Sequence, residues 1–360
     1  MGGKLADARP HILVAGAGIN GMLSAYYLQR AGMRVTICDA GPIPNPESAS
    51  HGAHRLIHPW PATDFLLTKM PEALRLWGEI LRDINCVGFV RTGVLVASPQ
   101  RGKLVGKTHA IWLDNRHAEW LLAGAGQEAE ALFFPDFGLL LAARILGALT
   151  QALRRNGVEM LDRSTIVDLD PATGRVDISN GESIHSDIVV LAAGWQARKL
   201  KHAENLSELL SQFSPRRSYV LYIAEKELPL RLRPKSSWAD FRGRDLWGVP
   251  AVYSYDVKFG CGQLTHNAEQ RAYSAEYVRD CFVYHYAEAD AAYEVLRRGR
   301  ISSNVWAFCP AGKMVRTIER CIVLTSDSGG GFKLAPVAGL EACAAVEKAL
   351  RGGDRHRQIV

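Results

Sequence analysis

Three glycines near the N-terminus, Gly16, Gly18 and Gly21, have the spacing GxGxxG. Gly16 permits a tight turn out of a strand, Gly18 lets the backbone approach a pyrophosphate, and Gly21 lets a helix pack closely on the strand. The next backbone N–H groups, among them those of Ile19 and Asn20, would open a helix and face the phosphates. The spacing therefore predicts a dinucleotide site.

An acid, Asp39, follows the glycines at the end of the stretch RVTICD. A carboxylate there accepts the hydroxyls of a ribose and repels a 2′-phosphate, which disfavours NADP. FAD and NAD share this fingerprint, so the loop alone leaves an FAD enzyme and an NAD-dependent dehydrogenase both open. A glycine turn without a ligand is the structural alternative, and the chain holds no second GxGxxG.

Hydrophobic periodicity supplies the elements that would position these residues. Residues 11–16 and 34–39 read as strands and residues 19–31 as a helix, so the glycines lie in a β-turn-α-β unit of about 30 residues, the context that makes the fingerprint specific. Beyond it we predict a loop over 42–61, helices within 64–82 and over 116–128, 139–155 and 335–350, one long helix within 268–298, and strands over 89–97, 165–169, 174–178, 187–192, 218–224, 251–259, 303–308 and 320–325.

Composition excludes several classes of protein. The 360 residues are 48% hydrophobic, with a formal net charge of +6 and no basic stripe interleaved with aromatics, so we expect a globular chain that binds no nucleic acid. Seven cysteines without CxxC spacing argue against a disulfide framework or a structural zinc site and favour a reducing cytoplasm. No signal peptide and no run of 18 apolar residues is present, which predicts no membrane segment.

Three further stretches, SHGAHRLIH (50–58), DIVVLAAGWQARKL (187–200) and SDSGGGFKLAPVAG (326–339), join the glycine loop in chain order. Together they resemble the FAD-dependent amine and amino-acid oxidases of the D-amino-acid oxidase and sarcosine oxidase class, most closely the monomeric sarcosine oxidases. The resemblance implies an α/β fold, in which a Rossmann-type, glutathione-reductase-like FAD-binding domain is interleaved with a mixed-sheet α+β substrate domain. The expected boundaries are 10–88, 138–212 and 306–350 for the FAD-binding domain, and 89–137 and 213–305 for the substrate domain.

The resemblance also implies which residues meet the cofactor. The segment from Ser50 to Arg55 would run beside the flavin, although a surface ion pair is the alternative for Arg55. Small residues at 193 and 194 would let the backbone pass close to it, and the glycine run would offer N–H groups to its pyrimidine end. The implied FAD contacts are Gly16, Gly18, Ile19, Asn20, Gly21, Asp39, Ser50, His51, Gly52, Arg55, Val167, Ala193, Gly194, Trp195, Cys309, Gly329, Gly330, Gly331, Phe332 and Lys333.

Four residues, Lys258, Arg55, Lys333 and His58, are the implied catalytic set. Strand alternation puts Asp256 and Lys258 on the face opposite Val257 and Phe259, and the resemblance makes this lysine an activator of oxygen; a solvated strand lysine is the alternative. Lys333 matches a lysine that holds the substrate carboxylate. Its usual arginine partner is replaced by His58, which gives no bidentate fork, and the family histidine in the glycine run is replaced by Gly330. A sarcosine-like substrate is therefore in doubt.

Cys309, in VWAFCPAG, falls where the resembling oxidases attach their flavin covalently. A thiolate is required, and a neighbouring cation such as Arg55 or Lys313 would favour it. An ordinary buried cysteine is the alternative.

The implied activity is oxidation of a secondary amine or amino acid to an imine, with molecular oxygen reduced to hydrogen peroxide. An FAD dehydrogenase that passes electrons to a partner, and a flavin-binding subunit without catalysis of its own, are the alternatives. A flavin monooxygenase is disfavoured because no separate NAD(P)H motif is visible. Substrate identity and oligomeric state are open at this stage.

Overall fold

The computed structural model describes residues 9–59, 64–97, 109–113, 131–202, 204–240, 245–286, 290–309, 314–325 and 329–357, so the predicted helix over 116–128 and Lys313 lie outside the described residues. The chain divides into two compact units. The first unit comprises residues 1–52, 144–214 and 307–360, and the second comprises 53–143 and 215–306. Residues 53–88, which we expected in the nucleotide-binding domain, belong to the second unit.

A six-stranded sheet forms the centre of the first unit. Its strands are parallel to one another except for the edge strand β21, which pairs antiparallel with β22. The inner strands are almost wholly buried and apolar, as expected for a parallel sheet covered on both faces. The sheet order is β21 (Val315–Ile318), β22 (Cys321–Leu324), β13 (Ile188–Leu191), β1 (His11–Ala15), β2 (Arg34–Cys38) and β9 (Glu159–Leu161).

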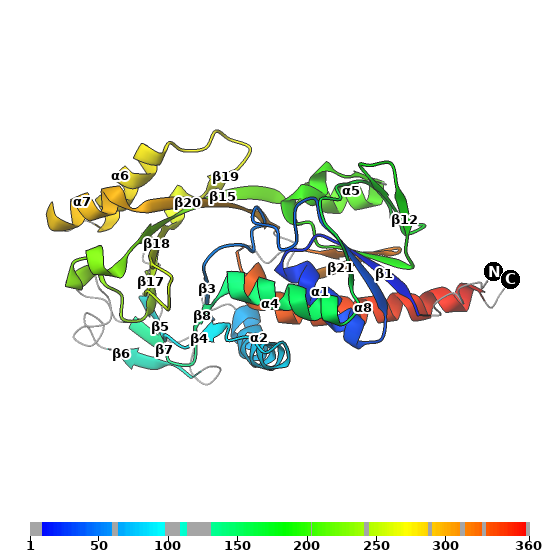
Figure 1. Cartoon of the computed structure of the whole chain (residues 1–360), viewed down its shortest axis with the longest axis horizontal. Coiled ribbons are helices and arrows are strands. Elements are labelled where there is room, and N and C mark those ends of the chain that lie inside the picture. The colour runs from blue at the N-terminus through cyan, green and yellow to red at the C-terminus, as the bar shows by residue number, and fades with distance from the viewer. Residues whose placement is uncertain are drawn as a thin grey trace. The chain divides into compact units, whose positions relative to one another are not determined.

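Three long helices lie in the first unit with this sheet, except for the first two residues of α4: α1 (Ile19–Arg30), α4 (Ala142–Arg155) and α8 (Gly331–Arg357). The two helices α1 and α8 lie side by side, dark blue and red in Figure 1. The predicted helix over 139–155 is shorter than expected, because its first residues form strand β8 (Gly138–Leu140). The last helix begins four residues earlier than predicted.

A smaller sheet completes the first unit with strands β12 (Ser183–His185), β11 (Arg175–Ile178), β10 (Ile166–Asp170) and β14 (Lys201–His202), beside helix α5 (Glu204–Ser211). Its buried side chains join those of β1, β13 and β22 in one apolar cluster.

A nine-stranded mixed sheet dominates the second unit, and helices α6 (Ala275–Tyr286) and α7 (Asp290–Arg298) pack their apolar faces on it. Besides this sheet, the unit holds helix α2 (Asp64–Asp83) and a small sheet of β3 (Arg55–Ile57), β8 and β4 (Phe89–Val90). The large sheet runs in the order β19 (His266–Asn267), β15 (Ser214–Ile223), β18 (Val257–Cys261), β17 (Leu246–Val249), β16 (Ser237–Asp240), β5 (Val94–Ala97), β7 (Ala131–Phe134) and β6 (Ile111–Leu113), with β20 (Arg300–Phe308) also paired to β15.

Four predictions for this unit were wrong in detail. The strand expected over 89–97 is split into β4 and β5, and the loop expected over 42–61 contains the short strand β3. The strand expected over 251–259 starts only at Val257, because residues 252–255 form a tight turn closed by two backbone hydrogen bonds. The single helix expected within 268–298 is two helices. None of the helices among the described residues combines the length and apolar character needed to cross a membrane.

Candidate cofactor and redox site

The glycine loop lies where the strand order of the first unit reverses. Strand β1 is followed by β2 on one side, whereas its other neighbour, β13, comes from much later in the chain. Ligands of open α/β sheets bind outside the carboxyl ends of the strands at such a switch point. Gly16 and Ala192 follow these two strand ends directly, and the Ala192 N–H donates to the Ala15 carbonyl oxygen at 2.8 Å.

Two of the predicted glycines are sterically required. Gly16 has φ +107, and a Cβ on it would lie 2.7 Å from the carbonyl oxygen of Ala192. A Cβ on Gly21 would lie 1.9 Å from the Gly16 carbonyl oxygen, so α1 could not pack as closely on the loop. The tight turn predicted at Gly16 and the close helix packing predicted at Gly21 are therefore present in the structure, whereas the approach of Gly18 to a pyrophosphate stays a prediction.

The N-terminus of α1 donates a hydrogen bond to a distant segment. It also holds one buried side-chain oxygen without a hydrogen-bond partner among the described residues. The Ile19 N–H donates to Ser50 Oγ at 2.9 Å, which brings the distant SHGAHR segment to the start of the helix. Within the described part of the chain, Asn20 Oδ1 is buried and has no hydrogen-bond partner. A hydroxyl donor of a bound ligand would satisfy this oxygen, and an anion would be favoured by the helix terminus.

Asp39 makes more hydrogen bonds within the protein than the sequence suggested. Its carboxylate accepts hydrogen bonds from the Ala17 N–H at 2.7 Å, from the Gly41 N–H at 2.8 Å and from Asn45 Nδ2 at 2.8 Å. A carboxylate offers about four acceptor positions, so roughly one is left for a ribose hydroxyl rather than two. Asp39 therefore fixes the glycine loop to the end of β2, and a ribose diol would have to displace the Asn45 amide to gain both contacts.

Several other predicted FAD contacts lie at the start of a 3-10 helix and in the smaller sheet of the first unit. Ala193 and Trp195, at the start of the 3-10 helix Gly194–Lys199, pack against the same apolar cluster that contains Cys309. Gly194 has φ +58, a conformation that favours glycine. Val167 is 40% exposed on β10, in the smaller sheet of the unit.

The glycine run opens helix α8. Gly329 has φ +94, Gly330 accepts the Leu334 N–H through its carbonyl at 3.0 Å, and the helix begins at Gly331. Lys333 lies in the first turn and is buried, as is Phe332. Lys333 therefore lies at the end of α8 where the helix dipole is positive.

Two of the predicted catalytic residues, Lys258 and Arg55, meet within the second unit. Lys258 is only 6% exposed, on a strand whose five residues are all buried, so the solvated-lysine alternative is wrong. Its Nζ donates to the His54 carbonyl oxygen at 3.2 Å and lies 5.0 Å from the centre of the Trp247 ring and 5.8 Å from that of Tyr222. Arg55 Nη1 donates to the same carbonyl at 3.0 Å.

We call this group the basic–aromatic cluster: His54, Arg55, Tyr222, Trp247, Lys258 and Arg300. Burial, and then the positive charge of Arg55, lower the pKa of Lys258 well below its usual value. The Arg300 guanidinium lies 4.4 Å from the centre of the Tyr222 ring. No ion pair between described residues includes Lys258, and the carboxylate of Asp256 acts on Tyr222 within the cluster.

His54 is a member that the sequence did not single out. Its ring is 1% exposed, and within the described residues its Nε2 has no hydrogen-bond partner. Burial, and the charges of Lys258 and Arg55, lower the pKa of His54 to about 3, so the imidazole is neutral. Among three histidines in SHGAHRLIH, nothing but burial distinguishes it; His51 and His58 are half-buried.

Trp247 reaches Lys258 because the facing residue is a glycine. Trp247 on β17 pairs with Gly260 on β18, where a Cβ would lie 2.0 Å from the indole. The Tyr286 hydroxyl donates to the carbonyl of Gly260 at 2.7 Å and anchors α6 to the same point. The pairing of Trp247 with Gly260 could not be predicted, since it depends on which residues face each other across two strands.

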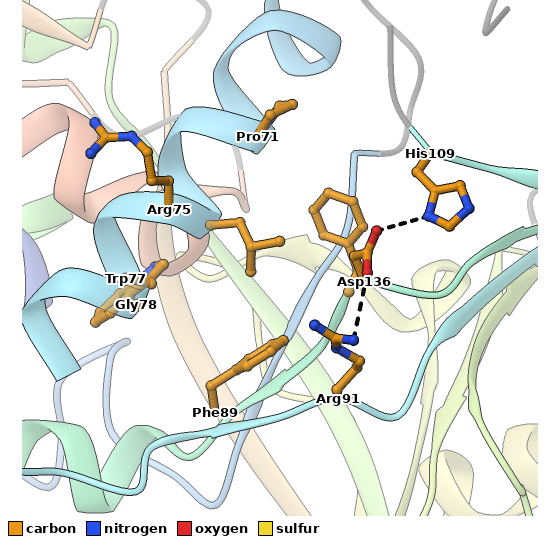
Figure 2. Close-up of a pocket in the computed structure, with 10 residues that line it drawn as sticks. Pro71, Arg75, Trp77, Gly78, Phe89, Arg91, His109 and Asp136 are labelled. Atoms are coloured by element: carbon orange, nitrogen blue, oxygen red, sulfur yellow. Dashed lines mark hydrogen bonds and ion pairs between the residues drawn. The ribbon is translucent and has the colours of Figure 1, made fainter. Parts of the chain in front are cut away.

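A cavity of about 530 Å³ lies elsewhere in the second unit (Figure 2). Trp77 of α2 and Phe89 of β4 form part of its apolar wall, while Asp136 at its rim pairs with His109 at 2.9 Å and Arg91 at 3.7 Å. These polar groups are largely solvated and already paired with one another, and none belongs to the basic–aromatic cluster. The cavity and the basic–aromatic cluster are therefore separate features of the second unit.

Comparisons with known proteins identify the family of this chain and related folds. A family model described as DAO, FAD dependent oxidoreductase, matches residues 11–345. A monomeric sarcosine oxidase from Bacillus sp. is 25% identical over 206 residues; the match covers 52% of this chain and 52% of that protein, about half the length of each. N-methyl-L-tryptophan oxidase from Salmonella arizonae is 25% identical over 367 residues, with 94% of this chain and 95% of that protein covered. Among solved structures, L-proline dehydrogenase from P. horikoshii shares the fold, with TM-score 0.76, 16% identity and 94% of each chain covered.

Proposed function

Because this chain belongs to the FAD dependent oxidoreductase family, we propose that it oxidises the C–N bond of a secondary amine or amino acid to an imine and passes the electrons to molecular oxygen. The overall change balances as amine plus oxygen giving imine plus hydrogen peroxide, and water then hydrolyses the imine. The observation that carries the oxidase assignment is Lys258 in its basic–aromatic cluster, buried and in no ion pair with any residue that the structure describes.

The first unit offers groups that fit FAD. The loop at Gly16, the N-terminus of α1 and the buried Asn20 oxygen are suited to the pyrophosphate and its neighbouring hydroxyls. When bound, FAD supplies the two-electron oxidation of a C–H bond next to nitrogen. The protein's part is to hold the cofactor, exclude water and position the amine. An unprotonated amine substrate would need no catalytic base.

Lys258 would act after substrate oxidation. Negative charge develops on oxygen as it accepts the first electron, and a fixed ammonium in a site with little water stabilises that charge without rearranging. Arg55 and Arg300 add positive potential, and Tyr222 and Trp247 hold the ammonium in place through their rings.

Substrate selection would fall to Lys333 and His58. A buried ammonium at the start of α8 suits a carboxylate, whereas the half-buried His58 is only partly charged near neutral pH and gives no bidentate contact. We therefore expect weaker demand for a carboxylate than a lysine–arginine pair would impose, and tolerance of a larger or less charged amine.

Covalent attachment through Cys309 is part of the same proposal. The thiol lies in the apolar cluster against which Ala193 and Trp195 pack, so it belongs to the same part of the first unit as other implied flavin contacts. Attachment would join sulfur to the flavin 8-methyl carbon, with loss of the thiol proton and a methyl hydrogen; the two electrons released would go on to oxygen.

The experiment is anaerobic mixing of the purified yellow protein with a panel of amines, including sarcosine, N-methyl-L-tryptophan and L-proline. We expect at least one member to bleach the flavin absorbance within seconds, and admission of air to restore the colour and produce hydrogen peroxide. A protein that takes up FAD but is bleached by no amine or amino acid would contradict the proposed function.

One observation favours a second function, a dehydrogenase that delivers electrons to a partner. The lowered pKa of Lys258 brings its neutral form closer to working pH, and a neutral amine stabilises developing negative charge poorly. If Lys258 is neutral in the reduced enzyme, the bound flavin would react slowly with oxygen and rapidly with an artificial electron acceptor.

A further inference from the structure

Three potential metal ligands meet at the end of the strand that carries Lys258. Cys261 is the last residue of β18, while Cys281 and His285 lie one turn apart on α6. The two sulfurs and an imidazole nitrogen all lie within 4.8 Å of one another. Cys261 is buried and the other two are half-buried, so the group is shielded yet open to an ion from solvent.

We propose that Cys261, Cys281 and His285 bind a zinc ion that fastens α6 to β18. Two sulfurs and one imidazole are a ligand set that zinc prefers, and four-coordinate zinc is tetrahedral. With Zn–S bonds of about 2.3 Å, two sulfurs of a tetrahedral site stand roughly 3.8 Å apart, so side-chain adjustments of about 1 Å suffice.

An oxygen atom that would serve as the fourth zinc ligand lies near His285. Gln263 Oε1 lies 3.1 Å from His285 Nε2, and it would exchange this hydrogen bond for the metal or give way to water. Either ligand is neutral. Two thiolates and Zn²⁺ therefore form a complex without net charge, which costs little to keep half-buried.

The surroundings of the three ligands favour a cation. The Asp245 carboxylate is so close to Gly262, the residue after Cys261, that a Cβ there would overlap it. The carbonyl-rich C-terminal end of α6 adds further negative potential.

A zinc site of this kind has no signature in the spacing of the cysteines. The expectation that zinc is absent rested on the lack of CxxC spacing, but these cysteines come from different elements and meet only through the packing of α6 on the sheet. The ion would fix the end of β18 three residues beyond Lys258, in addition to the Tyr286 contact with Gly260.

The test uses the purified holoenzyme, stripped of metal by a chelator and titrated with Co²⁺ under reducing, oxygen-free conditions. We expect one Co²⁺ per chain, with the intense long-wavelength bands of tetrahedral thiolate coordination, which lie beyond the flavin absorption. One equivalent of Zn²⁺ should bleach these bands and protect Cys281 from alkylation.

Cys281→Ser and His285→Ala should each weaken Co²⁺ binding at least tenfold and remove or alter the bands. Cys86→Ser, a change at a half-buried cysteine outside the group, should leave the titration unchanged. The proposal is overturned if the wild-type protein shows no stoichiometric uptake, if the bands survive both ligand changes, or if Cys261 and Cys281 are recovered as a disulfide from reduced preparations. Flavin content, measured in every sample, shows that the variants are folded.

Discussion

Lys258 is distinguished by its burial, because it is a cation placed where water is scarce. Lys258 and Arg55 share one backbone carbonyl as acceptor, that of His54, and Lys258 lies between two aromatic rings. Lys258 has no ion-pair partner among the described residues, and burying such a charge is unfavourable. In our account that strain is relieved when negative charge forms beside the cluster during turnover, which is why we attach the oxygen reaction to this point.

His54 gives a prediction about stability. Its pKa is about 3 in the folded protein and close to 6.5 in the unfolded chain, so the unfolded state binds more protons between these values. The stability that follows from keeping this imidazole neutral is present in full above about pH 6.5 and is lost as pH falls towards 3. In urea unfolding, we expect His54→Asn to flatten the loss of stability between about pH 7 and pH 4 by on the order of 3 kcal/mol.

The control is His109→Asn, at a side chain that is 65% exposed, which should follow the wild-type curve. His11, whose pKa burial also lowers, keeps some acid sensitivity in every variant. Parallel pH profiles for the wild type and His54→Asn would contradict a buried neutral role for His54.

Residue chemistry was predictable where it depends on local spacing and not where it depends on burial. Gly16 and Gly21 could be assigned from the GxGxxG spacing because the constraint acts over a few residues. The engagement of Asp39 by Asn45 could not, and neither could the orphaned nitrogen of His54, since both depend on contacts made only by the folded chain.

At the scale of elements, Gly260 controls how β17 and β18 pack around Lys258. An alanine there would place its Cβ 2.0 Å from the Trp247 indole, so the indole must leave the ammonium. We expect Gly260→Ala to lower the free energy of unfolding by about 1–3 kcal/mol and to slow the reaction of reduced enzyme with oxygen. Chemical denaturation and rapid-mixing absorbance measure the two effects.

Gly147→Ala is the matched control, because a Cβ at this position in α4 would meet nothing within 4 Å. Alanine in a helix interior should add up to about 1 kcal/mol of stability and leave the oxygen reaction unchanged. Equal stability losses in both variants would show that the Trp247 contact is not the cause.

Element prediction succeeded where one period ran uninterrupted and failed where local turns broke it. Strands β1 and β2 and helix α1 match their predicted ranges to within one residue at each end. Because of the tight turn at 252–255, β18 begins only at Val257, and the amphipathic pattern predicted as one helix within 268–298 is two helices, α6 and α7. Apolar spacing predicts which face is buried, but it does not show where the backbone turns.

At the scale of the whole molecule, the two units each bring a different part of the chemistry. The first unit holds the dinucleotide loop and Cys309, and the second holds the basic–aromatic cluster. The chain passes between the units several times, as the interleaved order of the predicted elements indicates. No Gly- or Ser-rich linker marks these crossings in the sequence.

A covalent bond at Cys309 would join the cofactor permanently to the chain. After acid precipitation of the purified protein, we expect the yellow colour in the pellet. Cys309→Ala should move it to the supernatant, and Cys343→Ala, at another buried cysteine, should not. Yellow in the wild-type supernatant would show that FAD is held without a covalent bond and that Cys309 is a packing residue.

The most direct test of the oxidase assignment needs no knowledge of the substrate. The holoenzyme is reduced with dithionite under nitrogen, mixed rapidly with oxygenated buffer, and followed by the return of flavin absorbance. We expect fast reoxidation that slows as pH rises through the lowered pKa of Lys258, and a rate about 100-fold lower in Lys258→Met. The exposed-lysine control Lys226→Met should match the wild type. Reduced wild-type flavin that persists in air would contradict an oxidase and favour the dehydrogenase, and wild-type rates in Lys258→Met would remove Lys258 from the mechanism.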